Sequence, residues 1–490
     1  MQNFIRTLTG IAAAAALGLV LMAGTAGHAS AQSPADQQAQ AVQPAAQPAG
    51  PPEKKPKDTG EYEIANAVII DLDRAKPNYP KAVTDLNTWT QKYPESDYKD
   101  DRLFYFMQAY GGLQPPQADK VLEYGAQLQA KDLKATLKEP ANIVQALYAI
   151  TANTPLVKDP TPAQLAIGQK GAKDLLAYVS VYFAAANKAA SVTDAQWTQA
   201  RTQVEQAAAA TLVYIAMYPG SQAMAKKDFP GAEQAFRQAA KDYPDNGWIA
   251  YNLGLSIIQQ LNAERRSEGI YYVARGVAMD PAKGGIADAA VRTKVEAYLK
   301  NLYTVYHGSD EGLDQLKQQA LASPAAPPDF KIRTASEIDA EKQKQFETQY
   351  PELAMWMKIK GMLETGDADQ TFTSQLKDTQ MPKLKGQVMS GTPECRSKTI
   401  LVAVPEPDQK STLTGEITLK LDAALTGKPT EGTEIVFEGA VPSAFTKDPF
   451  MLTLDIEKAK IEGLKTDPCT PPATKKAGTG VKKAPAKKSQ

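Results

Sequence analysis

The stretch FPGAEQAFRQAAKDYPDN, residues 229–246, decides how this sequence is expected to fold. Its apolar residues Ala232, Phe236 and Ala239 are spaced four and three apart, which places them on one face of a helix. Pro244 then ends the helix, because proline lacks the backbone N–H that would continue the hydrogen-bond ladder. The stretch therefore predicts an amphipathic helix that stops at a tight turn.

The same pattern occurs a second time, in YPKAVTDLNTWTQKYPES at residues 79–96. Its Ala82, Leu86 and Pro94 align without a gap with the first alanine, the phenylalanine and the second proline of the other copy. Trp89 fits worst, because it stands where the other copy has a small residue. A helix that is repeated within one chain predicts a repeating architecture.

A further helix is predicted after the better copy, in WIAYNLGLSII at residues 248–258. It contains Leu253 and Gly254. A glycine inside a helix costs about 1 kcal/mol unless another helix must approach its backbone closely. The expected unit is therefore a helix, a tight turn and a second helix pressed against the first.

These residues together resemble the tetratricopeptide repeat family, whose period is about 34 residues. Pro281 closes the next unit 37 residues after Pro244, so a short insertion is expected near residues 263–268. The resemblance implies a helical-repeat solenoid over residues 61–322, with one strong copy, one fair copy and several degenerate ones. An irregular α-helical domain is the alternative.

The resemblance also implies a concave groove lined by the first helix of each unit, and aromatic residues with Arg or Asn suit gripping an extended peptide there. Helical spacing puts on this face, in the strong unit, Trp248, Tyr251, Asn252 and Leu255, and in the looser unit Tyr98, Arg102 and Tyr105. The alternative is that these aromatic side chains fill the contact between neighbouring repeats.

The hydrophobic period changes from helical to alternating in the C-terminal part of the chain. LKGQVMS, KTILVAV, GEITLKLD, TEIVFEG and FMLTLD predict about five strands between Leu384 and Leu464. A sheet of this size is expected to close into a small barrel, at residues 383–465, because an open one would expose aggregation-prone edges. GQV and GTEIVFEG resemble the OB-fold, although AALTGKPTEG is too short for the helix usual between its third and fourth strands.

Residues 323–380 lie between the two domains and are expected to form a helical connector. The segment opens with the proline-rich SPAAPPDF and continues in a charged helical pattern. We expect it to pack onto the end of the helical domain. The predicted fold class is therefore multi-domain, an all-α repeat solenoid followed by a small all-β, OB-like barrel.

Both ends of the chain have compositions that are not typical of a folded domain. Residues 1–31 predict a signal peptide, with Arg6 before an apolar core and an Ala-x-Ala cleavage site ending at Ala31. A retained membrane anchor is the alternative, and no other stretch approaches the about 18 apolar residues of a membrane span. Residues 32–60, rich in Ala, Gln and Pro, and the Lys-rich residues 466–490 are expected to be disordered. Export to the periplasm is expected, with secretion as the alternative.

The two cysteines, Cys395 and Cys469, are predicted to form a disulfide, because the expected compartment is oxidising. Two buried free thiols are the alternative. A metal site is not expected, since two Cys and the distant His307 do not make a tetrahedral shell. His307 is expected to cap carbonyls at a helix end, and the charges of EYE at residues 61–63 are expected to be solvated.

The chain contains no Gly-rich phosphate loop, HExxH, GxSxG or CxxC motif, and no cofactor is expected. Its 55 basic and 55 acidic residues give no global reason to bind nucleic acid. The expected function is a non-enzymatic cell-envelope scaffold that binds protein partners through the groove. The alternative is a binder of cell-wall or surface polysaccharide through the β domain and the Lys-rich tail, and a carboxylate-based hydrolase comes third.

Overall fold

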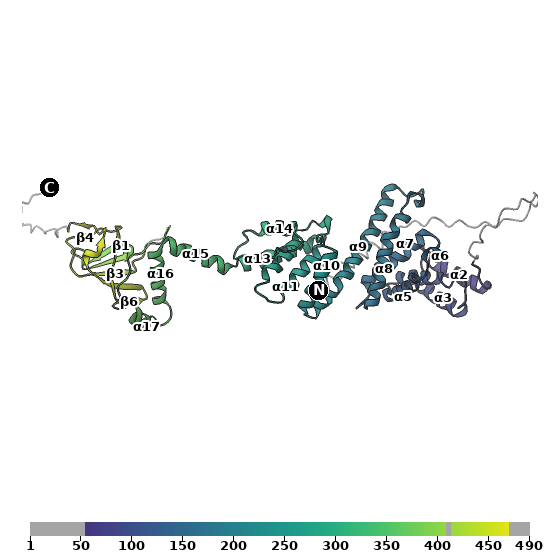
Figure 1. The fold of residues 1–490 in the computed structure, drawn as a ribbon, viewed down its shortest axis with the longest axis horizontal. Coiled ribbons are helices and arrows are strands. Elements are labelled where there is room, and N and C mark those ends of the chain that lie inside the picture. The colour runs from purple at the N-terminus through teal and green to yellow at the C-terminus, as the bar shows by residue number, and fades with distance from the viewer. Residues whose placement is uncertain (1–53, 408–412, 470–490) are drawn as a thin grey trace, which may run out of the picture. The chain divides into compact units, whose positions relative to one another are not determined.

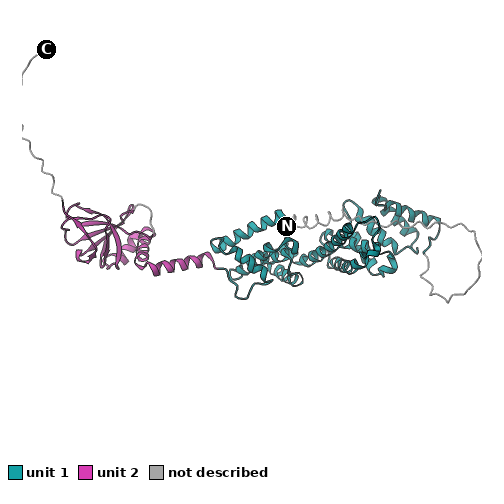
Figure 2. Cartoon of the chain, turned by 90° about the horizontal axis from the view of Figure 1, so that it is seen from above, with its two compact units in different colours: residues 1–332 teal, residues 333–490 magenta. Residues whose placement is uncertain are grey.

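The computed structural model describes residues 54–407 and 413–469. The predicted signal peptide lies outside these ranges, as do most residues of the segments expected to be disordered, 32–60 and 466–490. That expectation is corrected at their inner ends, because Thr59 and Gly60 begin a helix and Thr466–Asp467 form a strand. The chain divides into two compact units, residues 1–332 and 333–490 (Figure 2). The described part of the first is helical and the second contains the sheet, so helical repeats are followed by a small β domain, as predicted (Figure 1).

The helices of the first unit pack mainly against their neighbours in the chain, as expected for helical repeats. They are α2 (Thr59–Asp71), α3 (Tyr79–Lys92), α4 (Asp101–Gly112), α5 (Ala118–Gln129), α6 (Leu133–Leu137), α7 (Pro140–Asn153), α8 (Pro162–Tyr182), α9 (Asp194–Ala225), α10 (Phe229–Asp242), α11 (Gly247–Ile258), α12 (Arg266–Ala278), α13 (Ala289–His307) and α14 (Leu313–Ala322), with the 3-10 turns η1 (Thr154–Leu156), η2 (Ala185–Asn187) and η3 (Pro281–Lys283).

Two separate apolar cores stabilise the first unit, and α9 takes part in both. Val204 and Ala208 of α9 belong to the core that begins at Val68, whereas Met217 of α9 belongs to the core that ends at Ile332. α9 is a single helix of 32 residues, although Pro219 lies inside it and cannot donate to the helical ladder. The two cores are therefore joined by continuous helix.

The better copy of the repeated stretch forms α10, as predicted. Asp228 caps its start by accepting from the backbone N–H of Gly231 at 3.0 Å. Its predicted core residues Ala232, Phe236 and Ala239 are all buried. α10 ends at Asp242, two residues before Pro244. The four-and-three spacing therefore identified the buried face and the proline identified the stop.

The close approach predicted at Gly254 occurs between α11 and α12. A methyl group placed on Gly254 would lie 2.6 Å from the carbonyl oxygen of Gly269, so only glycine fits. Leu253 is buried beside it. The insertion was expected near residues 263–268, but residues 266–268 belong to α12. The long connection between these helices is residues 259–265, compared with residues 226–228 between α9 and α10. α12 ends at Ala278, and Pro281 begins η3.

The looser copy forms α3, and its misfit Trp89 is fully buried along with Ala82 and Leu86. The indole N–H of Trp89 donates to a carboxylate oxygen of Glu61, on α2, at 2.8 Å. The prediction that the charges of EYE are solvated is therefore wrong for Glu61, whose side chain is fully buried. α3 ends at Lys92, before Pro94, so this copy stops as the other does.

The expected connector, residues 323–380, is divided between the two units at residue 332. Its helices in the second unit are α15 (Ala335–Gln349), α16 (Pro351–Glu364), α17 (Ala368–Thr371) and the π-helical turn η4 (Phe372–Leu376). Trp356, Ile359 and Leu363 of α16 lie in the same apolar core as the strands. The expectation that this segment packs onto the helical domain is therefore corrected: α16 covers the sheet.

All five predicted strands are present, together with β6 and three short strands that the sequence did not reveal. They are β1 (Leu384–Thr392), β2 (Thr399–Ala403), β3 (Ile417–Leu421), β4 (Lys428–Pro429), β5 (Glu434–Phe437), β6 (Val441–Lys447), β7 (Phe450–Ile456), β8 (Ile461–Glu462) and β9 (Thr466–Asp467), with the 3-10 turn η5 (Lys458–Lys460) before β8. The main sheet has the order β6-β7-β3-β2-β1-β5-β8, and β3 and β7 are its parallel pair.

This sheet must curl, because β5 and β6 lie far apart in the strand order but are joined only by residues 438–440. In a flat sheet they would be about 24 Å apart, whereas the link from Phe437 to Val441 spans at most about 14 Å. Curling encloses alternate apolar side chains, among them Val388, Leu419 and Leu454, which are fully buried. Residues 422–433 contain no helix, as their small number predicted.

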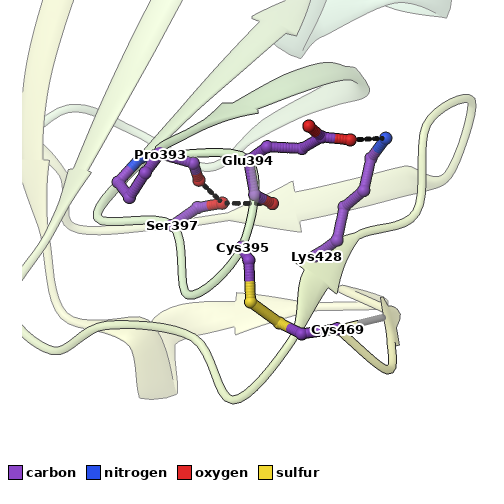
Figure 3. The surroundings of a disulfide bond; sticks show 6 residues. All are labelled: Pro393, Glu394, Cys395, Ser397, Lys428 and Cys469. Atoms are coloured by element: carbon purple, nitrogen blue, oxygen red, sulfur yellow. Dashed lines mark hydrogen bonds and ion pairs between the residues drawn. A yellow bond between two sulfur atoms is a disulfide. The ribbon is translucent and has the colours of Figure 1, made fainter. Parts of the chain in front are cut away.

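The predicted disulfide joins Cys395, between β1 and β2, to Cys469, two residues after β9 (Figure 3). The Cα atoms of the two cysteines are 5.7 Å apart. Ser397 braces the same loop by donating from its hydroxyl to the carbonyl oxygen of Pro393 at 2.7 Å. The disulfide therefore ties the last described residue of the chain to the β domain. Within the described ranges, no helix combines the length and the apolar character that crossing a membrane requires.

Candidate peptide-binding face

The candidate face lies on α11, whose start is set by Asn246. The side chain of Asn246 accepts from the backbone N–H of Ile249 at 3.0 Å and so caps the helix. Because an α-helix repeats every 3.6 residues, Ile249 and Leu253 lie inside the second core, whereas Trp248 and Tyr251 are half-buried and pack against its edge. All four residues predicted for the strong unit, Trp248, Tyr251, Asn252 and Leu255, are half-buried.

An aromatic row crosses from α11 to α13. The rings of Trp248 and Tyr251 meet edge to face with centroids 5.8 Å apart, and Tyr251 meets Tyr298 of α13 in the same way at 6.4 Å. Tyr298 is 37% exposed. Edge-to-face pairs at these separations are the geometry that aromatic rings favour. We call Trp248, Tyr251 and Tyr298 the aromatic row.

The tyrosine hydroxyls of the row are neutral hydrogen-bonding groups. Burial, and secondly the neighbouring Tyr298, raises the pKa of Tyr251 to about 12. Burial also raises the pKa of Tyr298. Both hydroxyls therefore stay protonated at physiological pH, and each can donate as well as accept. The row offers rigid apolar surface with polar tips, which is the character of residues that dominate binding interfaces.

Asn252 and Leu255 lie one helical turn after Trp248 and Tyr251. The amide N–H of Asn252 donates to the backbone carbonyl of Trp248, one turn earlier, at 2.8 Å. Leu255 packs against the second core and is half-buried. Asn252 therefore uses part of its hydrogen-bonding capacity inside its own helix.

The residues predicted for the looser unit do not form an equivalent face. α4 begins at Asp101, so Tyr98 lies in the turn before the helix and not on it. Arg102 is only 4% exposed, and its guanidinium donates to the carbonyl oxygens of Trp89 and Tyr93 at 3.0 Å each. The expectation that Arg102 contacts a ligand is corrected, because it holds the C-terminal end of α3.

Tyr98 and Tyr105 pack around the buried indole of Trp89. Their ring centroids lie 6.1 Å and 6.5 Å from it. The hydroxyl of Tyr98 also donates to the backbone carbonyl of Lys54 at 3.1 Å. In this unit the aromatic residues fill space within the fold, which is the alternative that the sequence left open.

A cluster of alternating charges lies between α10 and α12. The carboxylate of Glu233 accepts two bonds from Arg265, at 2.6 Å and 2.9 Å, and one from Arg237 at 2.8 Å. Glu268 is paired with both arginines. Burial alone would raise the pKa of Glu233, but hydrogen bonds from Arg265, Gln260 and Arg237 outweigh it and lower that pKa to about 2. Because every charge has an opposite neighbour, we interpret the cluster as a structural clamp.

The side chains that could bind a metal ion are dispersed within residues 54–407 and 413–469. These ranges contain no group of three or more His, Cys, Asp or Glu placed to hold a metal ion. His307 ends α13, where its ring lies 5.0 Å from that of Tyr303. Gly308 follows in the left-handed conformation, with φ of 94°, that ends many helices.

No protein-family model matches this chain, and no curated protein matches it either. The resemblance to tetratricopeptide repeats therefore depends on the residues quoted above and on their places in the fold.

Sequence reasoning missed Tyr298, the most exposed member of the aromatic row. The residue lies in EAYLKNLY on α13, where Val295, Leu299 and Tyr303 form the buried face. Tyr298 lies three residues after Val295, so helical spacing places it at the edge of that face. The missing information was which neighbouring helix it meets, since the contact with Tyr251 joins residues that are distant in the sequence.

Proposed function

We propose that this protein is a non-enzymatic helical-repeat adaptor of the cell envelope, which binds an extended segment of a protein partner on the aromatic row. The observation that carries the proposal is the position of the row. It crosses two successive odd-numbered helices, α11 and α13, which correspond to the groove-lining helices of the tetratricopeptide resemblance. The envelope location depends on the predicted signal peptide.

The chemistry of the row suits a peptide better than a small polar ligand. Trp248, Tyr251 and Tyr298 present flat apolar surface together with hydroxyl groups that remain neutral. Such rings stack on peptide bonds and side chains, and they lose little conformational entropy because they have few rotatable bonds. An extended peptide across α11 and α13 could contact all three rings.

Selection from a random peptide library on the full-length protein tests the proposal. Peptides enriched on the wild type should lose about 10-fold or more in affinity for Tyr298→Ala and for Trp248→Ala, because central aromatic contacts dominate binding. Affinity would be measured by isothermal titration calorimetry. Tyr298→Ala is the cleaner variant, since this side chain is more exposed than the other two.

The matched control is Tyr62→Ala, which removes a 59% exposed tyrosine from α2, away from the row. Affinity for the selected peptides should be unchanged in this control, and circular dichroism should confirm that each variant is folded. Peptides that bind Tyr298→Ala and Trp248→Ala as tightly as the wild type would refute the aromatic row as the binding face.

A further inference from the structure

A groove runs along α16 in the second unit. One hollow of about 460 Å³ lies between the start of α16, the start of β1 and the chain that leaves β2. A second hollow of about 290 Å³ continues along α16 toward its C-terminal end. The two hollows adjoin, because both are lined by Leu353, Val404 and Glu406. We call them together the α16 groove.

The α16 groove carries an excess of negative charge. Among the described residues, its lining includes two lysines, Lys360 and Lys385, and five carboxylates, Glu352, Glu364, Glu406, Glu416 and Glu434, a net charge of −3 from +2 and −5. Both lysines are already engaged. Lys385 pairs with Glu434 at 2.9 Å, and Lys360 pairs with Glu416 and, at 3.9 Å, with Glu364. A cationic occupant would therefore meet a complementary field.

The part of the groove beside the first turn of α16 is apolar between these charges. Tyr350 and Pro351 line it from the α15–α16 junction, and Pro405 lines it from the chain after β2. Leu353 and Val404 complete this surface. Grooves lined by aromatic and proline residues accept extended, proline-containing segments, which need little ordering on binding.

We propose that the chain's own C-terminal segment, residues 470–490, binds in the α16 groove. The composition of this segment complements the charge and the apolar lining of the groove. It contains six lysines, no acidic residue and three prolines, at Pro471, Pro472 and Pro485. The lysines compensate the excess carboxylates, and the prolines favour an extended backbone.

The segment can reach the groove from its point of attachment. Cys469 lies two residues beyond Asp467, which pairs with Lys428 across the β4–β9 ladder. Glu434, in the groove lining, is six residues from Lys428 along the chain. Extended-chain lengths place Glu434 within about 34 Å of Cys469. The lysines lie six to nineteen residues past Cys469, an extended reach of about 20–65 Å.

Zero-length carbodiimide crosslinking of the full-length protein tests this contact. The reagent joins a lysine amine to a carboxylate only when the two touch, and mass spectrometry of peptic fragments identifies the joined residues. Crosslinks from lysines of residues 470–490 should concentrate on Glu352, Glu364 and Glu406. Their yield should exceed the yield at the exposed Glu438 and Glu462, outside the groove, by about five-fold.

Two matched double variants sharpen the test. Glu352→Gln with Glu406→Gln should lower crosslinking at the remaining groove site, Glu364, whereas Glu438→Gln with Glu462→Gln should leave the groove crosslinks unchanged. Salt at about 1 M should also suppress the groove crosslinks, because screening then acts over about 3 Å. Equal crosslink yields at groove and control carboxylates would overturn the proposal.

A mixture of isotopically heavy and light protein separates binding within one chain from binding between chains. Binding within one chain gives groove crosslinks that join heavy to heavy and light to light. Mixed heavy–light crosslinks at the statistical ratio would mean that another molecule supplies the segment, and the proposal as stated would fail. The aromatic row is not involved, so this result is independent of the proposed peptide binding.

Discussion

The helices α3 and α10 come from two copies of one sequence pattern, yet they fill their cores differently. At the third core position α10 has Ala239. The ring of Phe236 packs against Gly220 on α9, and a methyl group added to Gly220 would lie 2.7 Å from that ring. α3 has Trp89 at that position. Small residues thus allow close helix approach in one copy, whereas a large ring fills the space in the other.

The two solutions have different electrostatic consequences. The indole of Trp89 brings a polar N–H into the core, and the buried Glu61 satisfies it. Burial by itself would raise the pKa of Glu61, but hydrogen bonds from Ser96, Trp89 and Lys57 and the charge of Arg102 lower it. In the second copy Ala239 brings no polar group into the core. The carboxylate of α10, Glu233, instead pairs with arginines between α10 and α12. A repeat pattern therefore specifies which face is buried but not how the space is filled.

The largest expected effect comes from removing the large ring that fills the core beside α3. Trp89→Ala should lower the free energy of unfolding of the first core by about 3–5 kcal/mol, because it leaves a cavity and removes a donor from the buried Glu61. Ala239→Gly at the matched position of α10 should cost only about 1 kcal/mol. Hydrogen–deuterium exchange of α2–α4 and α10–α12 measures the two cores separately. Equal losses in both copies would contradict the comparison.

The next effect concerns the clamp of the second copy. Glu233→Gln should cost about 1.5–3 kcal/mol at neutral pH, the range for hydrogen bonds to charged groups. Because the pKa of Glu233 is lowered from 4.5 to about 2, its stabilisation is fully present above pH 4.5 and is lost as pH falls toward 2. Wild type and variant should therefore converge in acid, as followed by denaturant unfolding of α10–α12 from pH 7 to pH 2.

The control for the clamp is an exposed pair of the first copy. Lys81 pairs with Asp85 on α3 at 2.8 Å, and both side chains are partly solvated. Asp85→Asn should change stability by less than about 0.5 kcal/mol at neutral pH. A Glu233→Gln effect as small as this one would show that the clamp contributes no more than a surface ion pair.

A third prediction tests the close approach of two helices. Gly254→Ala should destabilise the second core by about 1–3 kcal/mol, because the added methyl group meets backbone atoms of α12 that cannot move aside independently. Gly361→Ala, in a helix where nothing lies within 4 Å of the added group, should instead stabilise by about 0.5–1 kcal/mol. Thermal unfolding of both variants checks the opposite signs. Stabilisation by Gly254→Ala would contradict the packing described here.

Most of the fold could be predicted because the patterns are local. Apolar spacing located α10, and alternation located five strands. The sequence did not predict β6, because Pro442 interrupts the strand pattern. The pairing of β6 with β7 is irregular between Pro442 and Ala444. The packing of α16 on the sheet was not predicted either. The spacing of Trp356, Ile359 and Leu363 shows an apolar face, but it does not show which core that face covers.

The candidate site was harder to predict because it depends on contacts between distant residues. Spacing placed Trp248 and Tyr251 on the predicted groove-lining face of α11, but the contact of Tyr251 with Tyr298 needs the packing of α13. Arg102 was misjudged for the same reason. A charged residue beside aromatic residues is typical of a recognition surface, and only the fold shows that its guanidinium holds carbonyl oxygens of Trp89 and Tyr93.

The continuous helix α9 has a consequence for the order in which the protein forms during synthesis. Its first half is anchored in the first core, with Thr211 donating to the carbonyl oxygen of Thr151 at 3.1 Å. A helix is costly to nucleate but cheap to extend, so the half that carries Met217 can grow as a prolongation of a structure already in place. We therefore expect the first core to form before the second as the nascent chain lengthens, with α10 packing onto a helix that is already in place.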